Sequence, residues 1–321
     1  MAILDVLNIL AGLCMATESA ALHDEMGGDV AVILVNRRLR RRREIVLMAG
    51  MALGDLIYGG GVLEGSLEDA YRLARGEPVR LTAPWQCFKR LKMPLFIIGS
   101  QAAALMMVVM SVDRLIAVRW YIYYGGLTLT YAKRALTAVF SYALCSCFLM
   151  GLLSYFLTER TNSVSDVCYT SDAIPCYAWL QTGVQLVCGS LSCLLCGLAI
   201  LFYRVYIASL PQSLRDINLE RQNRFTKLVG AATGMTFCTY VIPHSVIRYL
   251  DAAGLEGESI WTAKEILYQI TALNSIANFV IFGFFHPDIR QILLCRRPRT
   301  NIQCTQQPMS QLPMNRRSND Y

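Results

Sequence analysis

The sequence is poor in charged residues and in histidine. Only 17% of its 321 residues are Asp, Glu, Lys or Arg, whereas about 25% are charged in ordinary globular domains. Its three histidines, His23, His244 and His286, lie far apart, and no Cys/His spacing matches a zinc site. Because 55% of the residues are hydrophobic, these deficits argue against a soluble enzyme, a disordered regulator and a disulfide-held scaffold.

Motifs that bind phosphate or carry out redox chemistry are missing as well. Gly59–Gly61 is not followed by the Lys-Ser/Thr of a phosphate loop. Cys193 and Cys196 form a C-x-x-C inside an apolar segment, where small packing residues are a better interpretation than a redox pair. Gly50 and Gly54 have the spacing of closely packed helices. We therefore expect no enzyme and no metal site.

What the sequence does contain is a series of long apolar segments. A membrane-spanning helix needs about 20 mostly apolar residues, and backbone polar groups in hydrocarbon must be satisfied within the segment. Six segments meet this requirement and predict six transmembrane helices: Val46–Leu63, Met93–Val118, Ala135–Leu157, Tyr177–Tyr203, Leu228–Leu250 and Ile266–Phe285.

A seventh span would come first in the chain, and its sequence is weak. The segment Ala11–Val35 contains Glu18, His23, Asp24, Glu25 and Asp29. Each charge near the centre of a helix costs about 2.5–3.5 kcal/mol of insertion free energy. Three interpretations stay open: a weak span rescued by its neighbours, a span shifted to Ile3–Leu22, or an N-terminal segment assigned in error.

The basic residues predict the orientation of the chain. The net charge is +7, and twenty of the 30 Lys and Arg residues fall in alternate loops, beginning with the run Arg37–Arg43. By the positive-inside rule these loops face the cytosol, which places the C-terminus inside. The positive charge is thus a topology signal, and nucleic acid is not an expected partner.

Four polar features inside the predicted spans occur in a recognisable order. Asp55 lies in Leu-Gly-Asp-Leu of the second span, and Asp113-Arg114-Leu115 ends the third. Pro243 interrupts the sixth span, and the seventh contains Leu-Asn-Ser-x-x-Asn with Asn274 and Asn278. Together these features resemble the rhodopsin-like G-protein-coupled receptors, in a form similar to the nematode serpentine chemoreceptors, over about Gly28 to Cys295.

The resemblance implies an all-α, multi-pass plasma-membrane protein with a seven-transmembrane helix bundle. Residues 1–10 would be an outer segment, 11–295 the receptor domain, and 296–321 a disordered cytosolic tail. The implied function is chemosensory: an external small molecule binds, and a heterotrimeric G protein responds inside. Membrane lipids surround such a bundle, and arrestin is a further partner of the family.

Individual roles carry over where residues match. Arg114 resembles the family's switch arginine, held by Asp113 until activation; a basic residue reaching the headgroups is the alternative. Asp55, Asn274 and Asn278 resemble a buried polar network that is often linked by water or a sodium ion, and plain interhelical hydrogen bonding is its alternative. Pro243 would kink its helix, with or without a switching role.

The resemblance also implies a disulfide and a lipid-facing helix. The family ties the top of the third span to the second outer loop, which here gives Cys87 with Cys168, or Cys176 as the other partner. After the last span, Pro287 and the apolar positions that follow predict a short amphipathic helix on the inner leaflet. Cys295 at its end is either a palmitoylation site or an unmodified cysteine.

The family's ligand pocket lies between the outer halves of the third, fifth, sixth and seventh spans. Candidates that could point into it are Phe96, Ser100, Gln101, His244, Arg248, Tyr268 and Thr271. A histidine and an arginine facing inward would favour a polar or acidic small ligand. His244 as a hydrogen-bonded core residue and Arg248 as a headgroup contact are the simpler interpretations.

Several positions depart from the family pattern. The last span has no Pro or Tyr after Asn278, Val241 replaces an aromatic residue before Pro243, and Trp120 and Tyr121 follow the Asp-Arg-Leu run where a proline is expected. Alternative hypotheses are a peptide- or amine-type receptor, a transporter, an intramembrane hydrolase built on Ser190 or Ser192 with His244, and a degraded receptor gene.

Overall fold

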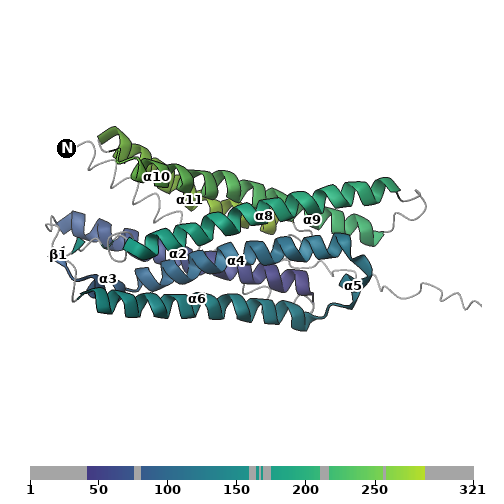
Figure 1. Ribbon diagram of the computed structural model, residues 1–321, viewed down its shortest axis with the longest axis horizontal. Coiled ribbons are helices and arrows are strands. Elements are labelled where there is room, and N and C mark those ends of the chain that lie inside the picture. The colour runs from purple at the N-terminus through teal and green to yellow at the C-terminus, as the bar shows by residue number, and fades with distance from the viewer. Residues whose placement is uncertain are drawn as a thin grey trace, which may run out of the picture.

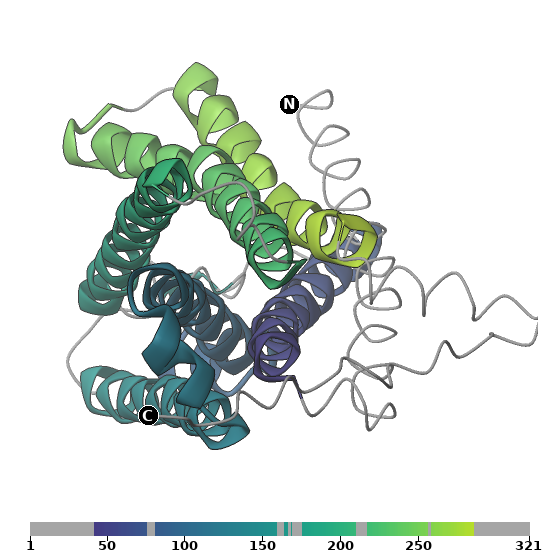
Figure 2. The same ribbon diagram turned by 90° about the vertical axis from the view of Figure 1, so that its right-hand side faces the viewer.

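The protein is described here by a computed structural model that places residues 42–75, 81–158, 164–165, 168, 175–209, 217–255 and 258–285. Long helices lie side by side in a bundle (Figures 1 and 2). The α-helices are α2 (Arg43–Arg75), α3 (Pro84–Phe88), α4 (Lys92–Arg119), α5 (Tyr121–Gly126), α6 (Leu129–Thr158), α8 (Pro175–Ser209), α9 (Ile217–Thr236), α10 (Ile242–Ala252) and α11 (Glu258–Phe285). A π-helical turn, η3 (Phe237–Val241), joins α9 to α10, and the short strands β1 (Leu81–Thr82) and β2 (Val164–Ser165) pair antiparallel.

Within the described ranges, four helices are long and apolar enough to cross a membrane. They are Arg43–Gly65 of α2, Lys92–Arg119, Leu129–Phe156 of α6 and Leu180–Tyr206 of α8. These helices coincide with four of the six predicted spans, so the chain has the character of a helical membrane protein. The fifth and sixth, Leu228–Leu250 and Ile266–Phe285, lie in the α9–η3–α10 run and in α11. Their crossing of a membrane stays a prediction.

Three expectations fall on parts of the chain outside these ranges. The weak first span, Ala11–Val35, is one of them. The amphipathic helix after Phe285, with Cys295 at its end, and the tail from residue 296 are the others.

Helix α4 packs against α2, α6 and α8, and glycines bring its backbone close to that of α2 (Figure 2). A Cβ atom on Gly99 would lie 2.2 Å from the backbone nitrogen of Tyr58, and one on Gly54 would lie 2.9 Å from that of Ala103. A Cβ on Gly50 would lie 2.2 Å from a methyl carbon of Leu136 in α6. The close helix packing predicted from Gly50 and Gly54 is therefore confirmed.

Methionine is prominent among the buried residues between these helices. Its flexible, unbranched side chain fits irregular gaps between helices. The buried methionines of this cluster are Met48, Met51, Met106, Met107 and Met110.

The π-helical turn η3 lies directly before Pro243. The backbone N–H of Ile242 donates to the carbonyl of Phe237, five residues earlier, which is the spacing of a π turn. Pro243 has no N–H to donate, so a regular helix would lose a hydrogen bond at this position. The widened turn and the proline together make this the irregular point of the α9–α10 run.

Candidate functional site

A buried ion pair lies at the end of α4. Asp113 and Arg114 are each only 1% exposed. The Arg114 guanidinium donates through Nε to Asp113 Oδ2 at 3.1 Å, and through Nη2 to the same oxygen and to the hydroxyl of Tyr124. Hydrogen bonds between ionised partners are roughly twice as strong as neutral ones, and the surrounding burial strengthens them further. The Arg114 side chain is thus held by Asp113 of its own helix and by Tyr124 of the short helix that follows.

Tyr124 reaches this pair because the chain reverses after α4. The backbone leaves the helical conformation at Trp120, with φ −126° and ψ 60°, and α4 ends there. Helix α5 then returns Tyr124 to the ion pair, where the tyrosine is only 2% exposed. The Tyr124 hydroxyl donates to Asp113 Oδ2 at 3.1 Å. Burial raises the pKa of Tyr124 to about 12, so the phenol keeps its proton and remains a donor at physiological pH.

Arg43, the first residue of α2, links α2 to α5. Its Nη1 donates to the carbonyl oxygens of Tyr124, at 2.7 Å, and of Leu127. Its guanidinium carbon lies 3.6 Å from the centroid of the Tyr124 ring, which is cation–π geometry. One member of the arginine run that predicted the topology therefore also has a specific structural contact. We call Arg43, Asp113, Arg114 and Tyr124 the arginine cluster.

A small cavity, mainly apolar in surface but lined by several polar side chains, lies between the helices of the bundle. Its volume is about 30 Å³ on a scale where one water molecule needs roughly 10–15 Å³. Residues from α2, α4, α8, α9, η3 and α11 line it: Met51, Asp55, Ser100, Ala103, Ala104, Met107, Gln185, Gly189, Thr236, Tyr240, Asn274 and Asn278. The structure thus brings Asp55, Asn274 and Asn278 to one cavity.

Two groups that line this cavity have unused hydrogen-bonding capacity. Asn278 is 2% exposed, and neither its amide nitrogen nor its amide oxygen has a partner among the described residues; the same holds for Thr236 Oγ1. Asn274, in contrast, accepts a bond from Thr239 Oγ1 at 3.2 Å. A buried polar group without a hydrogen-bond partner costs about 1–3 kcal/mol of folding free energy. A water molecule or a small cation in the cavity would satisfy the Asn278 amide.

Three oxygen-bearing side chains at this cavity are of the type that binds a small hard cation. Asp55, 3% exposed, supplies one carboxylate, and Asn278 and Thr236 supply neutral oxygens. Oxygen donors of this kind suit sodium, magnesium or calcium better than they suit a transition metal. The low charge of the set favours a monovalent ion.

Polar contacts also join α4, α8 and α9 between this cavity and the arginine cluster. Ser111 Oγ lies 2.6 Å from Ser192 Oγ, and both hydroxyls are fully buried. Cys196 Sγ lies 3.2 Å from Ser111 Oγ and 3.4 Å from Thr233 Oγ1. Cys196 is therefore a packing and hydrogen-bonding residue, in line with the interpretation of the C-x-x-C as structural.

The same contacts bear on the hydrolase alternative. The Ser192 hydroxyl is engaged with Ser111 and with the carbonyl of Met107, at 3.2 Å, and Ser190 is exposed. His244 lies against Tyr240, with ring centroids 4.3 Å apart, and its Nδ1 lies 3.1 Å from the Tyr240 carbonyl, to which it donates. A serine activated by His244 has no support in this geometry.

The predicted ligand-binding residues of α4 point to three different neighbours. Gln181 of α8 donates to Ser100 at 2.9 Å, while Gln101 donates to Ser146 of α6 at 3.0 Å. The Phe96 ring lies 5.0 Å from that of Tyr58 in α2. Since consecutive helical residues are rotated by about 100°, adjacent positions face different helices. The structure does not bring these three candidates together.

Two further candidates face the interior. Arg248 of α10 donates to Thr182 Oγ1 from Nε at 3.1 Å and from Nη2 at 2.9 Å, which links α10 to α8. Thr271 is 3% exposed in α11. The backbone of Tyr268 lies in the same helix, but its side chain is outside the described part of the structure.

Sequence reasoning missed the polar face of α8. Gln181, Thr182 and Gln185 are 5%, 4% and 3% exposed, and they contact Ser100, Arg248 and the cavity. Their spacing places them on one side of the helix. Polar residues in an apolar helix are functional candidates by default, and that rule would have found them.

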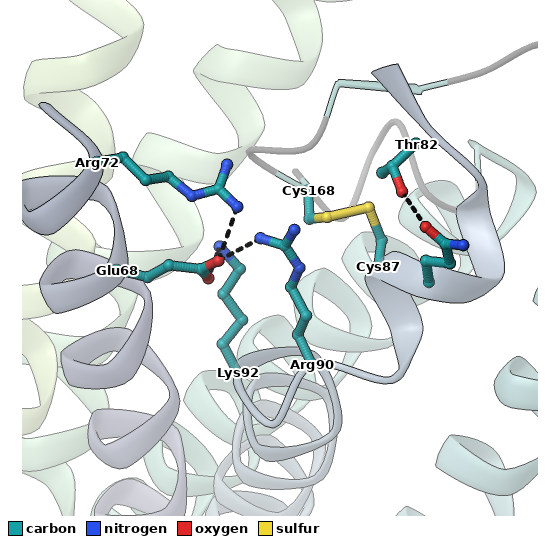
Figure 3. Close-up of a disulfide and its surroundings, with 8 residues drawn as sticks. Glu68, Arg72, Thr82, Cys87, Arg90, Lys92 and Cys168 are labelled. Atoms are coloured by element: carbon teal, nitrogen blue, oxygen red, sulfur yellow. Dashed lines mark hydrogen bonds and ion pairs between the residues drawn. A yellow bond between two sulfur atoms is a disulfide. The ribbon is translucent and has the colours of Figure 1, made fainter. Parts of the chain in front are cut away.

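The other end of the bundle carries the disulfide that the resemblance implies. Cys87 and Cys168 are bonded, with Cα atoms 5.3 Å apart (Figure 3). The side chain of Cys176, the alternative partner, lies outside the described residues. The bond ties the α3 segment, just before α4, to the segment that follows β2.

Comparison with family models and with curated proteins found no match for the chain.

Proposed function

We propose that this chain is a seven-helix chemosensory receptor of the plasma membrane, which passes the binding of an external small molecule to a heterotrimeric G protein inside the cell. The observation that carries the proposal is the arginine cluster. A guanidinium buried at a helix end and held by one carboxylate and one phenol can be released by a modest helix movement. Its release would change the charge and shape of the surface at that end.

The seven spans of the proposed bundle come from three sources. Four are the apolar helices of the described residues, two are the α9–η3–α10 run and α11, and one is the N-terminal segment. With the arginine cluster inside, the disulfide end faces outward, where disulfides persist.

An epitope tag at the N-terminus tests this topology. On intact cells we expect an antibody to reach it, and a tag at the C-terminus to be accessible only after permeabilisation. A chain with six spans would hide both tags until the cells are permeabilised. The control is a tag in the segment between α2 and β1, which should be exposed on intact cells in either case.

Signal transmission would run from the α8–α10 contacts to the arginine cluster. A ligand that replaces the Arg248–Thr182 or Ser100–Gln181 contact would move α8 and α10. The irregular turn before Pro243 would pass that movement to α9, and α9 meets α8 at Cys196 and Thr233. Ligand binding would then shift a population between two helix arrangements rather than create a new one.

A sodium ion near Asp55 is part of the proposal. Asp55, Asn278 and Thr236 would hold it, and its charge would stabilise the ionised carboxylate inside the bundle. The ion would also satisfy oxygens that have no protein partner among the described residues.

Basal signalling tests the function without knowledge of the ligand. We expect Asp113→Asn to raise ligand-independent nucleotide exchange on a purified heterotrimeric G protein by several-fold, because a neutral amide holds the Arg114 guanidinium less strongly. Adding Arg114→Ala to this variant should return exchange to background.

Arg119→Ala is the matched control, because Arg119 ends the same helix but is exposed. Its guanidinium carbon lies 5.8 Å from the centroid of the Trp120 ring. The variant should leave nucleotide exchange at the wild-type level. Equal exchange by wild type and Asp113→Asn, at equal amounts of folded protein and across the main G-protein classes, would contradict the proposed function.

A further inference from the structure

An exposed cation lies over a tryptophan ring at each end of helix α4. At the disulfide end, Lys89 Nζ lies 5.3 Å from the centroid of the Trp85 ring. At the opposite end, the guanidinium carbon of Arg119 lies 5.8 Å from the centroid of the Trp120 ring. Lys89 and Arg119 are both exposed, and α3 and α5 lie at opposite ends of α4 (Figure 1). The same combination of side chains therefore occurs twice, separated by the length of the bundle.

Further aromatic side chains surround Trp85. The end of α6 supplies Tyr155, which is 50% exposed, and Phe156, which is 63% exposed. The Tyr155 ring meets that of Trp85 edge-on, with centroids 5.4 Å apart, and its centroid lies 5.7 Å from that of Phe156. These rings contact one another and still present much of their surface outward. We call Trp85, Lys89, Tyr155 and Phe156 the α3 belt.

Packing against α6 determines where α3 lies. Phe88, the last residue of α3, is 9% exposed, and a Cβ atom on Gly151 of α6 would lie 2.7 Å from its ring. The rings of Phe88 and Trp85 are nearly parallel, with centroids 6.1 Å apart. Gly151 precedes Tyr155 by four residues, about one helical turn. The last turns of α6 therefore contact both aromatic residues of α3.

Exposed aromatic residues also follow α4 at its other end. Trp120 is 54% exposed and Tyr123 of α5 is 66% exposed, whereas the neighbouring Tyr124 is buried in the arginine cluster. The start of α6 adds two exposed cations, Lys133 and Arg134. Helix α5 thus directs one tyrosine inward and the adjacent one outward. We call Arg119, Trp120, Tyr123, Lys133 and Arg134 the α5 belt.

The separation of the two belts matches the thickness of a bilayer. Helix α4 lies between them with 28 residues, which at 1.5 Å per residue is about 40 Å, and a bilayer with its headgroups is about 40–45 Å thick. In α6, no residue from Ala135 to Thr158 is charged. From Arg134 to Tyr155 this helix rises about 32 Å, close to the roughly 30 Å of the hydrocarbon core.

The composition of the belts suits the headgroup layer of a membrane. Trp and Tyr are enriched at both membrane–water interfaces, because one end of each ring system is apolar and the other carries an N–H or O–H group. A lysine or arginine at the same level extends its charged end toward the headgroups. The exposed cations of both belts are complementary in charge to lipid phosphate groups.

We propose that the α3 belt and the α5 belt lie in the two headgroup layers of the bilayer, so that α3 is an interfacial helix and not part of a loop in water. Cys87 lies between Trp85 and Lys89, which places its disulfide with Cys168 at the surface of the membrane. Helix α4 is then joined at each end to a segment that contacts headgroups. The inference goes beyond the proposed function, because it concerns the surrounding lipid and requires neither a ligand nor a G protein.

Quenching of tryptophan fluorescence by brominated lipids tests the position of the belts. The purified full-length chain is placed in nanodiscs of phosphatidylcholine that carries bromine either near the headgroup or near the end of the acyl chains. Compared with wild type, Phe156→Trp and Tyr123→Trp should each add fluorescence that the shallow bromine quenches at least about twofold more than the deep one. Trp85→Phe and Trp120→Phe should each remove fluorescence with the same preference.

Two control positions calibrate the depth scale. Leu144→Trp, at an exposed position near the middle of α6, should add fluorescence that the deep bromine quenches more strongly. Arg75→Trp, at the exposed end of α2, should add fluorescence that neither bromine quenches strongly. Phe156→Trp leaves Trp85 in place, so the α3 belt is tested even if Trp85→Phe does not fold. The proposal is overturned if the tryptophan added to either belt behaves like one of these two controls.

Discussion

Replacing Asp113 with alanine is expected to lower the free energy of unfolding by about 3–5 kcal/mol, because Arg114 would stay buried without its carboxylate. Breaking a buried pair by removing one partner costs far more than the pair itself contributes. The measurement is denaturant or thermal unfolding of the purified chain in a fixed lipid–detergent mixture.

A double substitution separates the ion pair from simple loss of packing. Asp113→Ala with Arg114→Met removes both charges and should recover much of the lost stability, because no uncompensated charge remains inside. Tyr124→Phe removes one hydroxyl that is bonded to both charged partners and should cost about 1.5–3 kcal/mol. If Asp113→Ala costs no more than Tyr124→Phe, the cluster is not the buried ion pair described here.

Gly99→Ala should be strongly destabilising. The new Cβ atom would lie 2.2 Å from the backbone nitrogen and 2.6 Å from the Cα atom of Tyr58, and backbone atoms cannot rotate away as a flexible side chain can. Inserting a methyl group into a packed interior costs about 1–3 kcal/mol, and a clash with backbone places this variant at or above the upper end.

Gly60→Ala is the matched control for Gly99→Ala. Gly60 lies in α2, and a Cβ atom there would meet nothing within 4 Å among the described residues. Alanine in a helix is more favourable than glycine by about 0.5–1 kcal/mol, so this variant should be slightly more stable than wild type. Unfolding measured under the same conditions should give the two variants opposite signs. Similar values for both would mean that α2 and α4 are not in backbone contact at Gly99.

The apolar parts of the helices could be predicted from sequence, but the extension of a helix beyond its apolar part could not. The predicted span Met93–Val118 differs from α4 by one residue at each end, because apolar residues occupy almost the whole helix. In α2, hydropathy ends the span at Leu63, but the helix continues to Arg75. Beyond the apolar part, the Glu68–Arg72 pair at i,i+4 supports the helix, and hydropathy does not detect such a pair.

Within the candidate site, contacts between residues adjacent in sequence could be predicted, and contacts between different helices could not. Asp113 and Arg114 are adjacent in the chain, so their pairing was accessible from sequence. Tyr124 was missed because its position depends on the reversal after Trp120, where the family pattern led us to expect a proline. Contacts across helices, such as Arg248 with Thr182, depend on how each helix is rotated about its axis, and no single segment encodes that rotation.

The π-helical turn at Phe237–Val241 has a consequence for that rotation. Such a turn accommodates one residue more than an α-helical turn, and each residue advances an α-helix by about 100°. Were this turn regular, α10 would be out of phase by that angle, and Arg248 would no longer be directed at Thr182. The number of residues in the turn, more than their identity, thus determines which face of α10 the bundle encloses. A single insertion or deletion there would present a different set of side chains to the same neighbours.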